Sequence, residues 1–431
     1  MANINTQSIR KEPYYHGWLP QHEIRRELCH NKGDFLIRLA DPRPGRQLTY
    51  ALSVHHGGDD YKHYRINHRD GKYFIAKYSF DTIQQMVEYH VALQASIQDN
   101  VVIKTAINRK TPTAWEPELP HGSIKKVEEE PIPILLHDIY FGWYVTPDGK
   151  ETLAAIRRAK LDTAKVEEIR AVLDEARVLA HLHHPHIIHY FGCTIATLNK
   201  VYMATELSEE GPLNYYLKKN PTLPMTRLNE LCLDVAWGLE YLHRKGYMHR
   251  ELNTYHCFVV NGKVKIYDFK YTVKRCVYLV PESEAVAARW TAPEVFRSRI
   301  CYRESDIWSF GVLCWEVYNY GKQPYEGITA ADVVLKVRDQ GYRLQFPDTV
   351  NKEIVDTITT ICWSEKLNQR LSMYNIAKVF ERITGKQAPD MGAMDPEIKA
   401  KIEKFKAEME QKKKEMEKKK KTGFFGFFKK K

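Results

Sequence analysis

The segment HRELNTYHCFVVNGKVKIYDFK, residues 249–270, brings two carboxylates, an arginine and an imidazole together within a short stretch of chain. Glu251 and Asp268 are residue types that accept a proton or hold a hard cation, and Arg250 is a residue type that binds an anion. His256 lies between them, and its nitrogen suits Mg²⁺ poorly because that ion prefers oxygen ligands. The segment therefore raises a question: is it catalytic, or does it keep only the outline of a catalytic segment?

A second candidate is an arginine inside an apolar segment, FLIRLA at residues 35–40. A charge inside a buried strand is costly unless it is paired. The guanidinium of Arg38 is a planar, permanently charged, bidentate donor of the kind that binds phosphate. The alternative is an ordinary half-buried arginine in an inert fold. We favour phosphate binding at Arg38.

The third candidate is the C-terminal stretch KKKKTGFFGFFKKK, residues 418–431, with seven lysines, four phenylalanines and no acid. Lysines attract anionic lipid by about 1 kcal/mol each near the surface, and aromatic rings insert at the interface. Before it, Asp395 and Pro396 predict the start of an amphipathic helix. The tail predicts contact with an anionic membrane surface. The alternatives are a solvated lysine-rich helix and nucleic-acid binding, and no nucleic-acid partner is expected.

Composition limits the classes of protein to consider. The 431 residues are 43% hydrophobic, enough for two or three domains with ordinary cores. No apolar run approaches the ~20 residues of a membrane span, and the first residues lack a secretory signal pattern. The eight cysteines are scattered without a C-x-x-C pair, which fits reduced thiols in an intracellular protein. We expect a cytoplasmic protein, peripheral at the inner face of the plasma membrane through its tail.

Periodicity divides the chain into five parts. These are an N-terminal extension at 1–13, a small α+β domain at 14–105, a Pro-, Lys- and Glu-rich linker at 106–133, a larger domain at 134–385 and a basic tail at 386–431. In the small domain, QHEIRRELCHNK and FDTIQQMVEYHVALQ have helical spacing, and DFLIRLA, LTYALSV and KHYRINH read as strands. In the larger domain, LNELCLDVAWGLEYLHRK and SDIWSFGVLCWEVYNY predict long helices. The fold class is therefore α+β.

The segments YYHGWLP, GDFLIRLA, YALSV and KHYRI, in this order, resemble an SH2 domain, an antiparallel sheet flanked by two helices that binds phosphotyrosine. The resemblance implies that Arg38 binds the phosphate, that His63 supports the phosphate and ring, and that Arg65 flanks the ring. The expected partner is a phosphotyrosine-containing protein. One departure is Gln21, which stands where a second arginine is common.

The segments DEARVLAHLHHPHIIHYFG, EYLHRKGYMHRE, KIYDFK, ARWTAPE and SDIWSFGVLCWE resemble a bilobal tyrosine kinase domain and, after an SH2 domain, the Fes/Fer group of non-receptor tyrosine kinases. The resemblance implies use of ATP and Mg²⁺ and an anchoring ion pair between Glu294 and Arg370. Glu175 matches the helix glutamate, Thr205 the gatekeeper and Glu206 the start of the hinge.

The residues that would perform phosphoryl transfer depart from the pattern. Of the glycine-rich loop only Gly142 remains. Arg157 replaces the strand lysine. Glu251, one methylene longer, replaces the catalytic aspartate. The metal-binding asparagine is His256 and the glycine after Asp268 is Lys270, which is expected to restrict the backbone and to bring a cation near the metal. Asn253, Thr254 and Tyr255 replace the usual A-A-R.

These departures predict a pseudokinase, a phosphotyrosine-binding adaptor or regulator whose kinase domain is impaired. The alternative is a weakly active tyrosine kinase with Glu251 as the base, and a third reading is a purely structural scaffold. Tyr278, in the expected activation loop, is a candidate phosphosite. We expect another kinase to phosphorylate it and the phosphate to order the loop against Arg250.

Overall fold

The computed structural model describes residues 7–27, 31–40, 49–109, 119, 122–125, 127, 139–146, 149–160, 166–197 and 200–389. The chain divides into two compact units, Met1–Lys386 and Gln387–Lys431. The predicted amphipathic helix and the aromatic, lysine-rich stretch of the tail lie outside the described residues. Within those residues, no helix is both long and apolar enough to cross a membrane.

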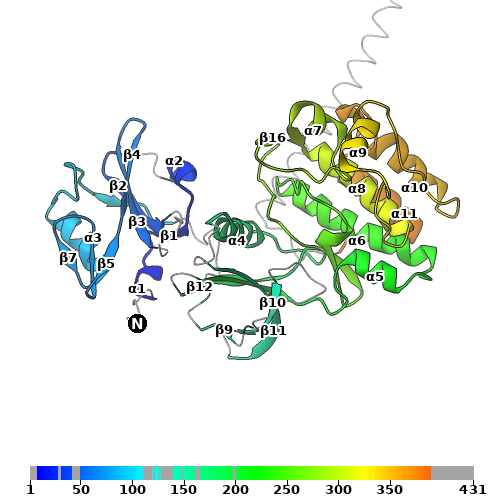
Figure 1. Ribbon diagram of the computed structural model, residues 1–431. Coiled ribbons are helices and arrows are strands. Elements are labelled where there is room, and N and C mark those ends of the chain that lie inside the picture. The colour runs from blue at the N-terminus through cyan, green and yellow to red at the C-terminus, as the bar shows by residue number, and fades with distance from the viewer. Residues whose placement is uncertain are drawn as a thin grey trace, which may run out of the picture. The chain divides into compact units, whose positions relative to one another are not determined.

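The N-terminal domain is built on a five-stranded sheet of order β1-β2-β3-β4, with β8 beside β2. Its strands are β1 (Tyr15–Trp18), β2 (Asp34–Leu39), β3 (Tyr50–Gly57), β4 (Asp60–Arg65) and β8 (Thr105–Ala106). A smaller sheet contains β5 (Asn67–Arg69), β6 (Lys72–Phe74) and β7 (Ser79–Phe80). In Figure 1 the five-stranded sheet lies between α2 (Ile24–Glu27) and α3 (Ile83–Ala92). All six residues of the central strand β2 are buried, including its arginine.

The two helices predicted for this domain differ in how well the sequence pattern describes them. Helix α3 begins after the N-cap Thr82, whose side chain accepts a hydrogen bond from the Gln85 backbone N–H. Its buried residues are Ile83, Met86, Val87 and His90. The first predicted helix begins as a 3-10 turn at Gln21–Glu23 and continues as the α-helix Ile24–Glu27, and its residues 28–30 lie outside the described residues. A short helix α1 (Gln7–Arg10) lies in the predicted N-terminal extension.

The smaller lobe of the second domain is a five-stranded sheet of order β12-β13-β11-β10-β9 with one helix, α4 (Val166–Leu179). The strands are β9 (Ile124–Lys125), β10 (Ile139–Val145), β11 (Glu151–Lys160), β12 (Tyr190–Thr197) and β13 (Lys200–Glu206). Strand β9 lies in the predicted linker and pairs with β10, so this part of the linker extends the sheet. Arg157 of β11 and Glu175 of α4 are brought together by this arrangement.

The larger lobe is mainly helical. Its principal helices are α5 (Leu213–Lys219), α6 (Met225–Arg244), α7 (Pro293–Ser298), α8 (Arg303–Tyr318), α9 (Ala330–Arg338), α10 (Lys352–Asp356) and α11 (Met373–Thr384). Short strands β14 (Cys257–Val260), β15 (Lys263–Ile266), β16 (Val277–Leu279) and β17 (Ile300–Tyr302) form two hydrogen-bonded pairs. Shorter helical turns are η2 (Thr254–His256), the π-helix η3 (Thr357–Cys362) and η4 (Leu367–Gln369).

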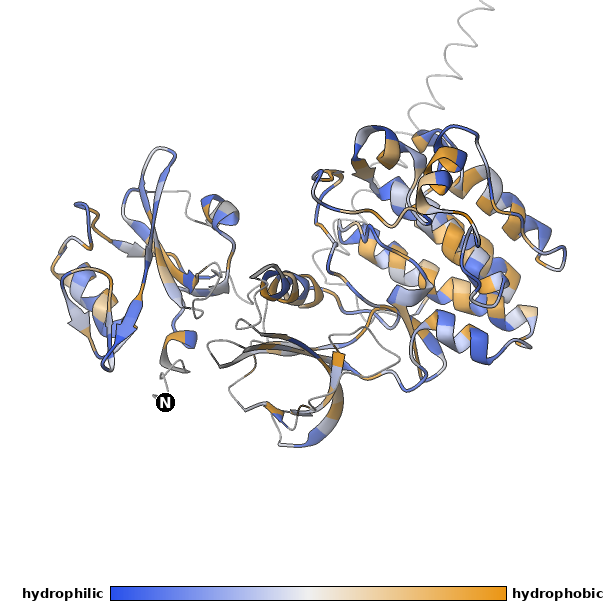
Figure 2. Cartoon of the chain, in the orientation of Figure 1, coloured by the Kyte–Doolittle hydropathy of each residue, from blue (hydrophilic) through white to orange (hydrophobic). Residues whose placement is uncertain are grey.

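Helix α8 runs through the core of this lobe. Figure 2 shows hydrophobic residues along α6 and α8 where the helices face one another. Gly311 of α8 has no room for a side chain, because an added Cβ would lie 2.6 Å from Trp363 Nε1. The glycine in SFG is therefore required by packing.

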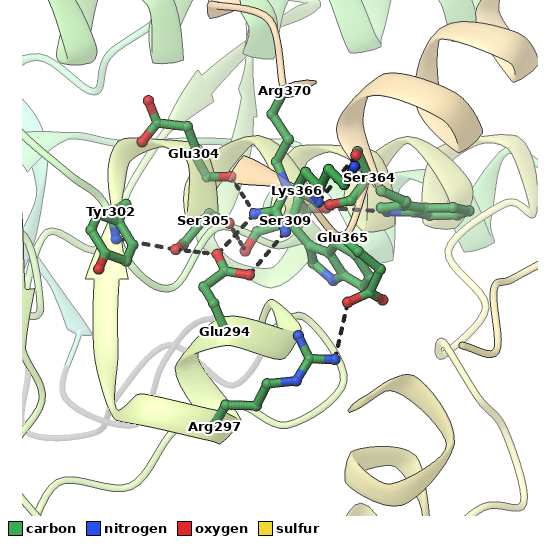
Figure 3. Close-up of polar contacts among 12 residues, drawn as sticks. Glu294, Arg297, Tyr302, Glu304, Ser305, Ser309, Ser364, Glu365, Lys366 and Arg370 are labelled. Carbon is green, nitrogen blue, oxygen red and sulfur yellow. Dashed lines mark hydrogen bonds and ion pairs between the residues drawn. The ribbon is translucent and has the colours of Figure 1, made fainter. Parts of the chain in front are cut away.

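The ion pair implied by the family resemblance is present in the core of the larger lobe. Arg370 Nη1 and Nη2 donate to Glu294 Oε1 and Oε2 at 2.8 and 2.9 Å, a bidentate pair. Arg370 Nη1 also donates to the Glu304 carbonyl, and the Ser305 hydroxyl donates to Glu294. Figure 3 shows Glu294 pointing at Arg370 from the neighbouring helix α7. This pair ties α7 to the segment before α11.

Candidate functional site

The chain from His249 to Glu251 is held by one buried carboxylate. Asp306 accepts hydrogen bonds from the backbone N–H groups of His249 and Arg250 at 2.8 and 2.7 Å, and His243 lies 2.9 Å from it. Arg250 has φ 74°, a left-handed conformation that a non-glycine residue rarely adopts. Asp306 stabilises this strained backbone and so fixes where the following Glu251 begins.

Arg157 forms a buried cluster with two carboxylates. Its Nη1 is ion-paired with Glu175 and lies 3.6 Å from Asp268 Oδ1. The three side chains are each less than a tenth exposed, and Glu175 also accepts from the Phe269 backbone N–H at 3.0 Å. Burial raises the pKa of Glu175 to about 7, against the opposing effect of Arg157. Arginine thus occupies the lysine position and reaches both carboxylates.

His256 uses both ring nitrogens within the protein. Nδ1 lies 2.8 Å from the Glu251 carbonyl oxygen and 3.8 Å from its carboxylate, and Nε2 lies 3.5 Å from Asp268 Oδ2. The Glu251 carboxylate therefore lies beside an imidazole. Burial raises the pKa of Glu251, with His256 opposing the shift and Asp268 adding to it.

These residues fit Mg²⁺ poorly. The two oxygens of Asp268 face Arg157 and His256, so nitrogen-bearing groups lie where a hard cation would need oxygen ligands. Among the described residues no group of three or more His, Cys, Asp or Glu side chains is arranged to hold a metal. The cleft therefore supplies its own positive charge around Asp268.

Neighbouring residues do not replace the missing metal ligand. Asn253 is buried, and its side-chain oxygen accepts from the backbone N–H groups of Tyr255 and His256 at 2.9 and 3.0 Å. This oxygen caps the turn η2 and points into the catalytic loop. The ring of Tyr255 is 40% exposed, so the position where arginine is usual presents an aromatic surface.

Lys270 differs from the sequence-based expectation. It is exposed, and its Nζ lies 5.1 Å from the ring centroid of Tyr271. Its backbone is outside the left-handed region, in contrast to Asp268 at φ 57°. A lysine is therefore accommodated here without backbone strain. The expected effect of Lys270 on the backbone is therefore not seen in its φ angle.

The remaining nucleotide-site candidates lie in the smaller lobe, in β10 and at the end of β13. Gly142 pairs with Ala154, and an added Cβ would lie 2.6 Å from Ile156 Cγ1, so sheet packing requires this glycine. Ile139 begins β10, whereas His137 lies outside the described residues. The carboxylate of Glu206 accepts from Lys265 Nζ at 2.5 Å and from the His189 backbone at 2.6 Å.

Thr205, at the predicted gatekeeper position, pairs with Ala155 across the sheet. Its hydroxyl is buried and has no hydrogen-bond partner in the described part of the chain. A buried hydroxyl without a partner is unfavourable, and Thr205 is 1% exposed.

In the N-terminal domain, three predicted residues lie on one face of the sheet. Arg38 pairs with Ala51, which pairs with Arg65, and Ser53 pairs with His63 in the next row. Arg38 Nε donates to Ser53 Oγ at 3.1 Å, and His63 Nδ1 lies 3.1 Å from the same hydroxyl. Ser53 thus joins the two residues predicted to bind phosphotyrosine.

The guanidinium of Arg38 is 2% exposed, and its Nη1 donates to the Leu19 and Leu39 carbonyls at 3.1 and 3.2 Å. A pocket whose lining includes Gln21 and His63 does not include Arg38. Its charged lining is mixed, with the acids Asp59, Asp60 and Asp174 and the arginines Arg25 and Arg170. Arg43 and Arg46, which follow Arg38 in the chain, lie outside the described residues.

Two residues that contact the predicted ones, Ser53 and Glu284, are not among the candidates predicted from the sequence. Ser53 is a buried polar residue in a strand of apolar residues, YALSV, directly opposite FLIR, and that pattern was available as a signal. Glu284 is ion-paired with Arg250, and nothing in the local sequence identifies it among several acids. Tyr278 was expected near Arg250, and its ring centroid lies 4.0 Å from the guanidinium.

Two protein-family models match this chain. The family model for protein tyrosine and serine/threonine kinases matches residues 137–380, and the SH2 domain model matches residues 14–90. Fer-related kinase 1 of Caenorhabditis elegans is 27% identical over 382 residues, 86% of this chain and 94% of that protein. Tyrosine-protein kinase Fer of Rattus norvegicus and of Homo sapiens are each 30% identical, over 90% and 88% of this chain.

The chain spans less than half of those two Fer kinases, 45% and 44% of their lengths. The shared region contains the SH2 domain and the kinase domain in the same order. The α+β organisation predicted from the sequence is confirmed by these matches, and so is the resemblance to the Fes/Fer group. The chain belongs to the protein kinase family, as a Fes/Fer-type non-receptor tyrosine kinase with an SH2 domain followed by a kinase domain.

Proposed function

We propose that this chain is a phosphotyrosine-binding signalling protein whose kinase domain transfers phosphate poorly or not at all. The kinase family uses ATP and Mg²⁺ generally, and phosphoryl transfer relies on positioning and charge neutralisation. The observation that carries the proposal is the surroundings of Asp268, whose two oxygens face Arg157 and His256. A carboxylate that already faces the guanidinium of Arg157 and the ring of His256 has less to gain from a metal ion.

The test is autophosphorylation of the full-length chain with ATP and either Mg²⁺ or Mn²⁺, read with an anti-phosphotyrosine antibody. Glu251→Ala and Asp268→Ala are the controls for contaminating kinases. We expect no signal above these controls. A signal that disappears in both variants would refute impairment.

The competing function is a weak tyrosine kinase with Glu251 as the base. It is favoured by the retained contact of Arg157 with both Glu175 and Asp268 and by the unpartnered hydroxyl of Thr205 near the hinge. Binding of a fluorescent ATP analogue, with and without Mg²⁺, separates nucleotide binding from transfer. Tighter binding in the presence of Mg²⁺ would favour this alternative.

Phosphotyrosine recognition is assigned to Arg38, with His63 and Ser53 beside it. Arg38→Ala is expected to reduce phosphopeptide affinity by about tenfold to a hundredfold, since a hydrogen bond to a charged group contributes about 1.5–3 kcal/mol. Isothermal titration with a degenerate phosphotyrosine peptide pool measures this. The matched control is Arg69→Ala, an exposed arginine paired only with Asp70 in the described structure. Equal affinity of Arg38→Ala and the parent would refute the assignment.

We further propose that the lysine-rich tail holds the protein at the cytoplasmic face of an anionic membrane. The supporting observation is the sequence itself, with four phenylalanines between two lysine clusters at residues 418–431. Pelleting with liposomes containing phosphatidylserine, beside neutral liposomes, tests this. Binding that does not depend on anionic lipid contradicts the proposal.

A further inference from the structure

Arg250 is already occupied by protein groups in the unphosphorylated chain. Its side chain is 5% exposed and is ion-paired with Glu284, and Nη1 donates to the Tyr271 carbonyl at 2.9 Å. The Tyr278 ring lies against the guanidinium with its centroid 4.0 Å away. The hydroxyl of Tyr278 donates to the other oxygen of Glu284 at 3.4 Å. One carboxylate therefore contacts both the arginine and the tyrosine.

Backbone hydrogen bonds hold the segment that contains Tyr278 and Glu284. Strand β16 pairs with β17, Tyr278 opposite Cys301, and the Val280 N–H donates to the Arg299 carbonyl at 2.7 Å. The Glu284 N–H donates to the Pro281 carbonyl at 3.0 Å, closing a turn. The Glu284 carbonyl accepts from Arg299 Nη2 at 2.6 Å. The turn therefore places the Glu284 carboxylate beside the Arg250 guanidinium.

The surroundings of Arg250 favour competition between anions over the filling of an empty site. The cavity beside it is small and is lined by the acids Glu251, Glu284 and Asp306 as well as by Arg250. A carboxylate has two oxygens, whereas a phosphate monoester offers three and a larger negative charge. A phosphate on Tyr278 would therefore compete with Glu284 for the same guanidinium.

We propose that Glu284 is an internal substitute for a phosphate on Tyr278, so that the activation segment is ordered on Arg250 without phosphorylation. Phosphorylation of Tyr278 then exchanges one anion for another. The phosphate places about two negative charges within a few ångströms of Glu284, and the two anions repel each other. Glu284 leaves Arg250, and its turn at Pro281–Glu284 opens while β16 stays paired.

The modifying reaction requires a separate tyrosine kinase and ATP. Tyr278 Oη forms a bond to the γ-phosphorus, the bond to the bridging oxygen of ADP breaks, and the phenolic proton passes to the base of that kinase. Tyr278 is half-buried, so part of its side chain is open to solvent, whereas the exposed Val277 and Leu279 lie on the opposite face of β16. The inference does not depend on whether the chain itself transfers phosphate.

Hydrogen–deuterium exchange of peptides covering residues 277–285 in the full-length chain tests whether Glu284 orders this segment on Arg250. We expect Glu284→Gln to accelerate exchange in this segment by about tenfold, since it removes a charge-assisted hydrogen bond. The matched control is Glu282→Gln, an exposed acid in the same turn, which is expected to leave exchange unchanged. Equal exchange in the two variants would overturn the proposal.

The second arm uses the chain with phosphotyrosine installed at position 278 during translation. We expect faster exchange at 281–285 and unchanged protection of 277–280. In this phosphorylated chain Glu284→Gln has no further effect, because Glu284 has already left Arg250. The proposal is overturned if phosphotyrosine leaves 281–285 as protected as before, or if Glu284→Gln accelerates exchange equally in both forms.

Discussion

Two buried polar networks in the kinase domain differ in what surrounds their carboxylates. In the larger lobe, Glu294 is bound bidentately by Arg370, and serine and a backbone carbonyl complete the network. In the cleft, one guanidinium, that of Arg157, is shared between Glu175 and Asp268. The first network matches the kinase pattern residue for residue, and the second reaches balance through substituted residues. In the Glu294–Arg370 network each charge has one partner of opposite charge. In the cleft, Arg157 is the cation beside Asp268 at the position where the kinase family binds a metal ion.

The largest effect is expected from Glu294→Ala. Removing one partner of a buried pair leaves Arg370 charged and unpaired, at a cost of about 3–5 kcal/mol. Arg370 makes no other contact with a carboxylate among the described ion pairs. Urea unfolding followed by tryptophan fluorescence measures the loss. A loss of stability smaller than that of Glu175→Gln would contradict the difference between the two networks.

Glu175→Gln is expected to cost less, about 1.5–3 kcal/mol, because the amide oxygen still accepts from Phe269 and Arg157 keeps Asp268. This site also carries a pH dependence. The pKa of Glu175 is about 7 in the fold against an ordinary 4.5, so the stabilisation from its protonation is fully present below about 4.5 and is lost as the pH rises to 7. The stability of the parent relative to Glu175→Gln should fall across this window. A constant difference between the two proteins would contradict the assignment.

Gly142→Ala tests whether the remaining glycine of the loop serves the fold or a nucleotide. Its Cβ would overlap Ile156, so we expect a loss of about 1–3 kcal/mol, as for other overpacked sites. Thermal unfolding of the variant measures the loss. If stability is unchanged while binding of an ATP analogue falls, the glycine belongs to a nucleotide site.

Arg382→Ala should have the smallest effect, about 0–1 kcal/mol, because its ion pair with Glu353 is exposed on both sides. The same unfolding experiment in 0.1 M and 1 M salt measures it. A loss comparable with that of Glu294→Ala would show that ion pairing alone, without burial, sets the scale.

Motif order predicted the residues of both sites but not their contacts. It named Arg38, His63, Glu175, Asp268 and Arg250 because short motifs carry residue types at fixed spacing, and their roles stay predictions. The helix predicted from Gln21 begins as a 3-10 turn, and its residues 28–30 lie outside the described part of the chain. Lys270 was expected to restrict the backbone and to bring a cation near the metal position. Its backbone is outside the left-handed region, and its exposed Nζ lies over the Tyr271 ring, while its charge opposes the rise in the pKa of Glu251.

The amino-acid sequence by itself determined the two domains, their order and the identity of the substituted catalytic residues. Only the tertiary structure decided what those residues do to one another. Ser53 joins Arg38 to His63 across three strands, His256 turns its two nitrogens to Glu251 and Asp268, and Glu284 reaches Arg250 from 34 residues away in the chain. Such partnerships depend on strand register and on turns that bring distant segments together, and local residue patterns do not encode the distance between them.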